Sequence, residues 1–262
     1  MTVRADVLGK LLILLSLSSA FVIGERPPPQ AASPRVERLL AAGDLHFGLR
    51  ESSVHAEQSL AAYRGALSID PHSIAARTKL LRALLWICDA HPPSALRRAN
   101  EALVVGRPLT DLANRPGRLL LCATYFRLST LATDGALALQ WLDLAEGQAR
   151  AAAEGPAAFE NGPSARSLAH AWLGRISLRR HRLGEGPGPA PEGLDRLRFA
   201  AGLRPRAAMV SQLLAVSYVE AGRPDLARKE CLAVLKGPVP PEDRAVAGLL
   251  RQFCARKAGV SP

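Results

Sequence analysis

Residues 209–236, MVSQLLAVSYVEAGRPDLARKECLAVLK, decide the fold of this chain. Apolar residues recur at helical spacing in both halves of the stretch, and the segment AGRPD separates the two halves. Gly222 stands where the first helix would end, and Pro224 stands where the second would begin. Because glycine commonly follows a helix and proline commonly opens one, the stretch predicts a helical hairpin.

The spacing of particular residues in this hairpin resembles the tetratricopeptide repeat. In that family a Leu, a small residue and a Tyr mark the first helix, and an Ala follows twelve residues after the small one. Leu214, Ala215, Tyr218 and Ala227 occupy these four positions. Cys231 departs from the pattern, since it stands where the family has an aromatic residue.

The same pattern recurs near the start of the chain. Residues 59–73, SLAAYRGALSIDPHS, resemble the second half of a repeat, with its small, aromatic, small and closing proline positions. These positions are Ser59, Tyr63, Ala66 and Pro71. Gly43 and His46 lie on an expected first helix, and we expect a turn before Ser59 that is longer than the family usually has.

Weaker helical pairs fill the interval between these two matches. The expected pairs are residues 77–90 with 92–108, 116–129 with 134–153, and 169–180 with 193–207, and a last helix at 241–258 would cap the array. We therefore predict an all-α fold, a right-handed alpha-solenoid of about five tetratricopeptide-like hairpins in a single domain over residues 35–257. Another type of α-solenoid and a closed helical bundle remain alternatives.

The N-terminal residues 1–24 predict export. Arg4 and Lys10 precede an uncharged apolar run over residues 11–24, and the Pro-rich linker ERPPPQAASP follows at 25–34. Residues 7–24 would form an N-terminal apolar helix, either retained as a signal anchor or removed as a signal peptide. The positive residues favour a single pass through a bacterial-type cytoplasmic membrane with the repeat domain on the exported side. Cleavage would instead give a periplasmic or secreted protein.

The sequence lacks the common motifs of phosphate-binding, zinc and serine-hydrolase sites, and no two histidines have the four-residue spacing of a helical metal site. We therefore expect no enzyme activity, no cofactor and no metal. The four cysteines, at 88, 122, 231 and 254, are too few for a disulfide scaffold. Cys231 and Cys254 could form a bridge in an oxidising compartment, although buried thiols are the commoner outcome on such apolar stripes.

The formal net charge of +11 favours anionic partners, and nearly all of the cations are arginines. In the tetratricopeptide family the first helices line a concave groove that holds peptides, and the resemblance implies the same surface here. Its Leu and Tyr positions place four arginines at or near that groove, namely Arg82, Arg127, Arg175 and Arg179. Their guanidinium groups would suit the carboxylates of an acidic segment. Alternatively, they are exposed side chains whose stems cover apolar neighbours.

A basic run, RISLRRHRLG at residues 175–184, is the densest in the chain, and on a helix Arg175, Arg179 and Arg182 fall on one side. We expect a non-catalytic protein-interaction or scaffold module, exported and tethered to the membrane through residues 7–24. Its partners would be other proteins, including acidic segments, and not nucleic acid. The alternative is a soluble periplasmic or secreted protein that binds an anionic ligand or an envelope polymer in an Arg-rich groove.

Overall fold

The computed structural model describes residues 33–50, 52–90, 92–110, 115–154, 162–184, 191–203, 208–235 and Cys254. These residues contain ten α-helices, two short 3-10 helices and no strand, so the all-α prediction is confirmed. The predicted N-terminal apolar helix at 7–24, nearly all of the Pro-rich linker, and the capping helix at 241–258 except Cys254 lie outside the described residues.

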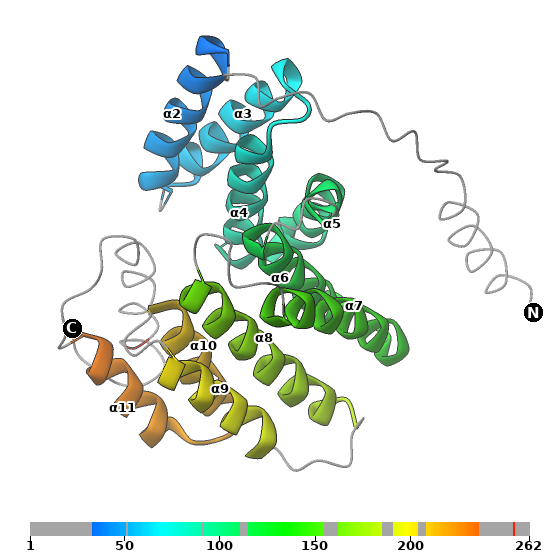
Figure 1. Cartoon of the computed structure of the whole chain (residues 1–262), viewed down its shortest axis with the longest axis vertical. Helices are drawn as coiled ribbons and strands as arrows, with labels where there is room; N and C mark the ends of the chain where they lie inside the picture. Colours follow the sequence, from blue (N-terminus) through cyan, green and yellow to red (C-terminus); the bar gives the residue numbers. More distant parts are fainter. Residues whose placement is uncertain are drawn as a thin grey trace, which may run out of the picture. The chain divides into compact units, whose positions relative to one another are not determined.

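The helices follow one another as hairpins, five of them in the described ranges (Figure 1). The pairs are α2 (Pro34–Gly48) with α3 (Ser53–Ile69), α4 (Ile74–Ala90) with α5 (Ala95–Gly106), α6 (Arg115–Leu131) with α7 (Gly135–Glu154), α8 (Gly162–Arg182) with α9 (Pro191–Leu203), and α10 (Ala208–Glu220) with α11 (Pro224–Leu235). The 3-10 helices are η1 (Pro92–Ser94) and η2 (Arg107–Leu109). Each hairpin packs on the next, and the first helices α4, α6, α8 and α10 contact one another in turn, which confirms the solenoid.

The hairpin of α10 and α11 forms as the sequence predicts. Gly222 has φ +70°, in the left-handed region that favours glycine, and it ends α10. The Arg223 N–H donates to the Tyr218 carbonyl at 2.8 Å, which satisfies a carbonyl at the end of the helix. Ala215 and Ala227 are fully buried in the same apolar cluster, so the small residues of the repeat pattern lie in the core that α10 and α11 share.

The turn before Ser59 is shorter than predicted. α3 begins at Ser53, six residues earlier than the matched pattern, so only residues 49–52 join it to α2. Ala56 is buried in the same apolar cluster as Phe47 of α2, which explains why an additional turn of helix forms there. The expected long turn is therefore wrong, and the first hairpin has ordinary proportions.

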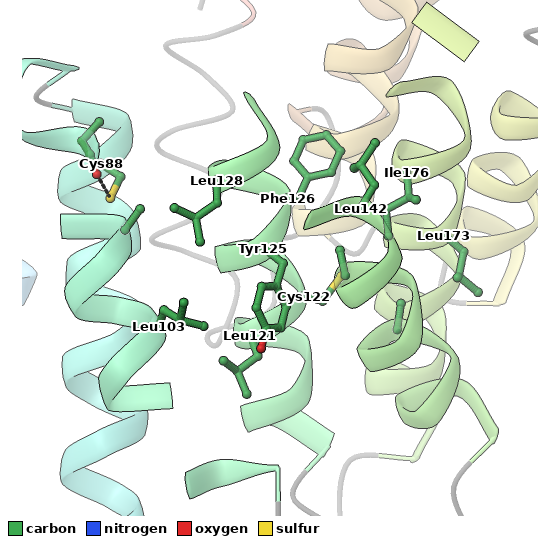
Figure 2. Close-up of a cluster of buried hydrophobic side chains, with 14 residues drawn as sticks. Cys88, Leu103, Leu121, Cys122, Tyr125, Phe126, Leu128, Leu142, Leu173 and Ile176 are labelled. Carbon is green, nitrogen blue, oxygen red and sulfur yellow. Dashed lines mark hydrogen bonds between the residues drawn. The ribbon is translucent and has the colours of Figure 1, made fainter. Parts of the chain in front are cut away.

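The core is continuous from one hairpin to the next. Figure 2 shows one buried cluster, to which α4, α5, α6, α7 and α8 all contribute side chains. In it the ring of Tyr125 stacks on that of Trp141, with centroids 5.9 Å apart, and Phe126 meets Trp172 at 5.5 Å. Each helix pair thus buries its apolar faces against its neighbours as well as within itself, as repeat architectures require.

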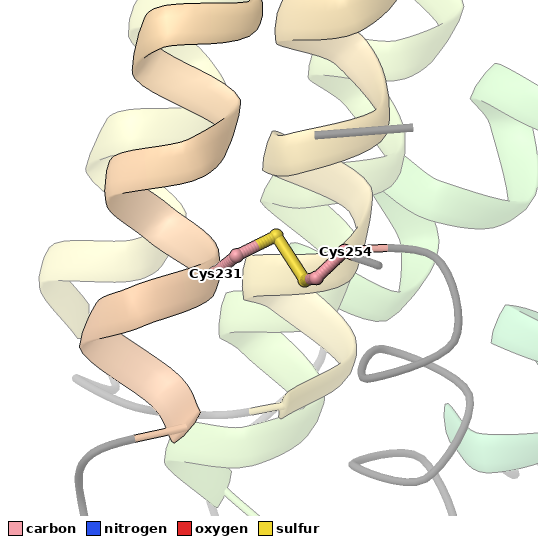
Figure 3. Close-up of a disulfide and its surroundings, with 2 residues drawn as sticks. All are labelled: Cys231 and Cys254. Atoms are coloured by element: carbon pink, nitrogen blue, oxygen red, sulfur yellow. A yellow bond between two sulfur atoms is a disulfide. The ribbon is translucent and has the colours of Figure 1, made fainter. Parts of the chain in front are cut away.

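Cys231 and Cys254 form a disulfide that joins α11 to a residue near the C-terminus (Figure 3). Their Cα atoms are 5.9 Å apart, although 23 positions separate them in the sequence. The expectation of buried thiols is therefore wrong for this pair, because sequence spacing does not show that the two positions meet. Cys88 and Cys122 are free and buried.

Among the helices of the described ranges, none has the length and apolar content needed to cross a membrane.

Candidate binding site: an arginine cluster on α6 and α8

The structure brings three of the four predicted arginines close to one another. Arg175 and Arg179 of α8 both reach α6, where Cζ of Arg175 lies 5.1 Å from the Phe126 ring centroid and Nη2 of Arg179 donates to the Ser129 carbonyl at 3.3 Å. Arg127 of α6 lies in the sequence between Phe126 and Ser129, the two residues that Arg175 and Arg179 contact. Arg182, one turn beyond Arg179 on α8, completes what we call the arginine cluster: Arg127, Arg175, Arg179 and Arg182.

Arg175 is the most deeply buried member of the cluster, with 8% of its surface exposed. Its Nη2 donates to Oε1 of Glu220 on α10 at 3.3 Å, and its guanidinium lies over the Phe126 ring. Its Nε is also buried and has no hydrogen-bond partner among the described residues. A buried N–H without an acceptor is costly, so this side chain has unmet capacity to bind an anion.

Two carboxylates face the cluster. Glu220 of α10 accepts from Arg175 through Oε1 and from Arg182 through Oε2, the latter at 2.7 Å. Asp89, at the end of α4, forms an ion pair with Arg127. Within the described residues, four guanidinium groups thus meet two carboxylates, which leaves an excess of two positive charges.

Burial makes these charges expensive. It is the largest cause that lowers the pKa of Arg127, Arg175 and Arg179 from the usual value for arginine. For Arg175, Glu220 opposes this shift, while Arg182 and Arg127 add to it by repulsion. For Arg179, Arg182 again adds to it. Arginine keeps its charge at neutral pH, so the site gains from any additional anion that binds there.

Arg82, the fourth predicted arginine, belongs to a different group. Its Cζ lies 4.8 Å from the centroid of the Phe47 ring on α2, and Cζ of Arg50 lies 4.4 Å from the same ring. Arg50 also lies over Trp86 at 5.6 Å. Arg82 therefore behaves as the alternative interpretation states, with its side chain covering an aromatic neighbour.

Glu220 and Asp89 are the members of the site that sequence reasoning missed. Glu220 lies 45 positions from Arg175 and 38 positions from Arg182, and the contact depends on how consecutive hairpins stack. A sequence signal did exist, since Glu220 ends a helix whose C-terminus disfavours negative charge. Glu220 could therefore be singled out as a candidate partner for the arginines, although its position alone does not show which of them it meets.

Sequence reasoning also missed a contact between His46 of α2 and His55 of α3. Their Nδ1 atoms are 3.1 Å apart and their ring centroids are 5.3 Å apart. Because an imidazole nitrogen lies about 1.1 Å from its ring centre, the two nitrogens point almost directly at each other, as in an N–H···N hydrogen bond. The described residues contain no group of three or more side chains suited to a metal ion.

Comparison with known proteins identifies the architecture by structure alone. No family model matches the sequence, and no curated protein matches it significantly. The structure is similar to the crystal structure of TTC0263, a thermophilic TPR protein in Thermus thermophilus, with a TM-score of 0.59 and 20% sequence identity. The match covers 84% of this chain and 99% of that chain.

A second similarity is to PilF of Pseudomonas aeruginosa, with 19% identity over 87% of this chain and 96% of that chain. Its TM-score of 0.43 is too low to carry an argument about the fold. The assignment depends instead on the Thermus structure, the five stacked hairpins and the buried small residues at the repeat positions. The chain has the fold of the tetratricopeptide repeat proteins.

Proposed function

We propose that this protein is a non-catalytic interaction scaffold, and that the arginine cluster holds an acidic segment of a partner protein. One observation carries the proposal: four guanidinium groups from α6 and α8, of which that of Arg175 is buried, outnumber the two carboxylates that face them. The Nε atoms of Arg175 and Arg179 also lack acceptors among the described residues. An Asp or Glu side chain, or a chain-terminal carboxylate, supplies the missing acceptors and the missing charge.

The repeat architecture supports a binding role for this surface. The first helices α4, α6, α8 and α10 contact one another in sequence, so residues on them form one continuous row across several repeats. A peptide laid along such a row meets charged groups from consecutive hairpins, and stacked repeats commonly bind extended segments in this way. The arginines of the cluster lie on α6 and α8, and the carboxylates that face them come from α4 and α10.

We further propose that the repeat domain works outside the cytoplasm, tethered by residues 7–24. Two features support export: the N-terminal charge and apolar pattern, and the Cys231–Cys254 disulfide, because disulfides persist mainly in oxidising compartments. Intact mass and carbonate extraction of the expressed chain test this part. An uncleaved chain that resists extraction supports the anchor, and a shortened chain found free supports the periplasmic or secreted alternative.

Binding of an acidic peptide to the full chain tests the proposed site. The probe is a fluorescein-labelled Glu-rich peptide, and the matched Gln-rich peptide controls for charge. The double variant Arg179→Gln/Arg182→Gln should weaken binding about tenfold or more, because each charge-assisted hydrogen bond contributes about 1.5–3 kcal/mol. Arg150→Gln/Arg196→Gln removes the same charge from α7 and α9, where both arginines form exposed ion pairs within one helix.

This control variant should bind within about twofold of the unmodified chain, since distant exposed charges are screened. If both double variants bind the Glu-rich peptide equally weakly, the binding is non-specific charge attraction, and this outcome would contradict the proposed site. Tight binding of the Gln-rich peptide would contradict it as well. A ligand such as inorganic polyphosphate that displaces the Glu-rich peptide completely would favour the alternative of an anionic-ligand or envelope-polymer binding protein.

A further inference from the structure

We propose that Glu220 is a built-in competitor: its carboxylate occupies the place of the partner's carboxylate, and the partner displaces it on binding. This inference rests on the proposed function of the arginine cluster. The inference identifies the binding group of the ligand as a carboxylate. The group that already lies between Arg175 and Arg182 is a carboxylate, and it accepts through both of its oxygens. A partner carboxylate fits the same two donors.

The geometry shows why Glu220 is loosely held. It is the last residue of α10, where the carbonyl ends of the helix repel negative charge. Its side chain is 29% exposed, so water reaches the carboxylate. The contact to Arg175 is long for a charge-assisted bond, at 3.3 Å, while the contact to the more exposed Arg182 is 2.7 Å.

The packing of α8 on α10 does not depend on this ion pair. Apolar side chains from both helices already bury one another in a shared cluster that includes Leu178 of α8 and Leu214 and Tyr218 of α10. Glu220 is the last residue of α10, two positions after Tyr218 and beside the turn that Gly222 closes. Moving one carboxylate into solvent therefore leaves the helix contact intact, which is what displacement by a ligand requires.

The ion pairs of Glu220 lower the apparent affinity of the arginine cluster for a partner carboxylate. When an internal group occupies a site for part of the time, the apparent affinity of a ligand falls by the fraction of molecules in which the site is open. The pair with Arg182 is partly exposed, with 38% and 29% of the two side chains accessible, and such a pair is weak. The contact with buried Arg175 is the longer of the two, and a partner carboxylate that replaces Glu220 keeps this guanidinium paired. The pair thus shields the buried charge of Arg175 in the free protein and still yields to an acidic partner.

The test compares Glu220→Gln with the unmodified full chain, using the labelled Glu-rich peptide. Removing the competing charge should tighten binding about twofold to sixfold, the range expected for displacing a weak ion pair. Glu192→Gln is the matched control, because Glu192 pairs only with Arg196 within α9 among the ion pairs of the described residues. It should leave the affinity unchanged within error.

The arginine dependence gives a second readout. In an Arg182→Gln background the gain from Glu220→Gln should shrink, because Glu220 then has only its long contact to Arg175 to occupy. Thermal unfolding of each variant verifies that it is folded. Equal affinity of Glu220→Gln and the unmodified chain, or weaker binding by a folded Glu220→Gln, would overturn the inference while leaving the binding site standing. Failure of the peptide to bind either chain would instead overturn the proposed function.

Discussion

Gly174 of α8 and Gly193 of α9 lie so close that neither has room for a side chain. A Cβ on Gly174 would come within 2.6 Å of the Gly193 carbonyl oxygen, and a Cβ on Gly193 would come within 2.8 Å of the Gly174 carbonyl oxygen. Real Cβ contacts do not approach backbone atoms this closely, so the backbones would have to separate. The absence of side chains at the two glycines allows this close approach of α8 and α9, and Arg175 follows Gly174 directly in the sequence.

Replacing Gly174 with Ala should therefore destabilise the fold. The clash is with backbone, which cannot rotate aside, so we expect a loss of about 1–3 kcal/mol in the free energy of unfolding. Urea denaturation followed by circular dichroism measures it. Gly147→Ala is the control: this glycine is exposed within α7 with open space around it, and alanine there should add up to about 1 kcal/mol. A neutral Gly174→Ala would show that the two helices are farther apart.

Reduction of the Cys231–Cys254 disulfide should lower stability. The bond closes a loop of 23 residues, and the chain-entropy relation gives a loss of about 3 kcal/mol without it. Thermal unfolding with and without dithiothreitol measures the effect, and Cys231→Ser/Cys254→Ser should match the reduced protein and be insensitive to the reductant. An unmodified chain with the same thermal transition with and without dithiothreitol would contradict the bridge.

The buried thiols Cys88 and Cys122 should react with iodoacetamide only after unfolding.

Glu230 should make stability depend on pH. Burial raises its pKa, and nearby Lys229 and Arg198 only partly offset the effect. A carboxyl whose pKa is raised by folding contributes stability below its ordinary pKa of about 4.3 and loses that contribution as pH rises through the folded value. Glu230 therefore opposes folding at neutral pH. Glu230→Gln should raise the melting temperature at pH 7, and the difference should vanish near pH 4. A variant that melts at the same temperature as the unmodified chain at pH 7 would refute this.

Arg82→Gln should leave acidic-peptide binding within about twofold of the unmodified chain, because Arg82 packs against Phe47 and is not part of the arginine cluster. The same fluorescence titration measures it. A loss comparable to that of Arg179→Gln/Arg182→Gln would mean that the binding surface extends to the first hairpin.

The sequence was sufficient for features that depend on local chemistry. Gly222 and Pro224 marked the turn between α10 and α11, and buried Ala215 and Ala227 marked the helix contact. The helical spacing of α8 also placed Arg175 and Arg182 on the same side, where both contact Glu220.

The sequence did not predict the contacts that depend on how consecutive hairpins stack. Asp89 meets Arg127, and Glu220 meets Arg175, only because consecutive hairpins pack at particular angles. The Cys231–Cys254 bridge joins α11 to a segment beyond it, and the His46–His55 contact spans the first turn. Arg82 was expected beside the other three arginines because its helical position is equivalent, but an aromatic ring from α2 holds it.

Site-specific photocrosslinking of the full chain in cells is the most direct test of the central claim that partners bind at the arginine cluster. A benzophenone amino acid replaces Thr130, which is exposed on α6 beside the Ser129 carbonyl that Arg179 contacts, or Val104, which is 70% exposed on α5. We predict discrete protein adducts from position 130, few from position 104, and loss of the former with Arg179→Gln/Arg182→Gln. Adducts only from position 104, or adducts from position 130 that persist in that double variant, would contradict the claim.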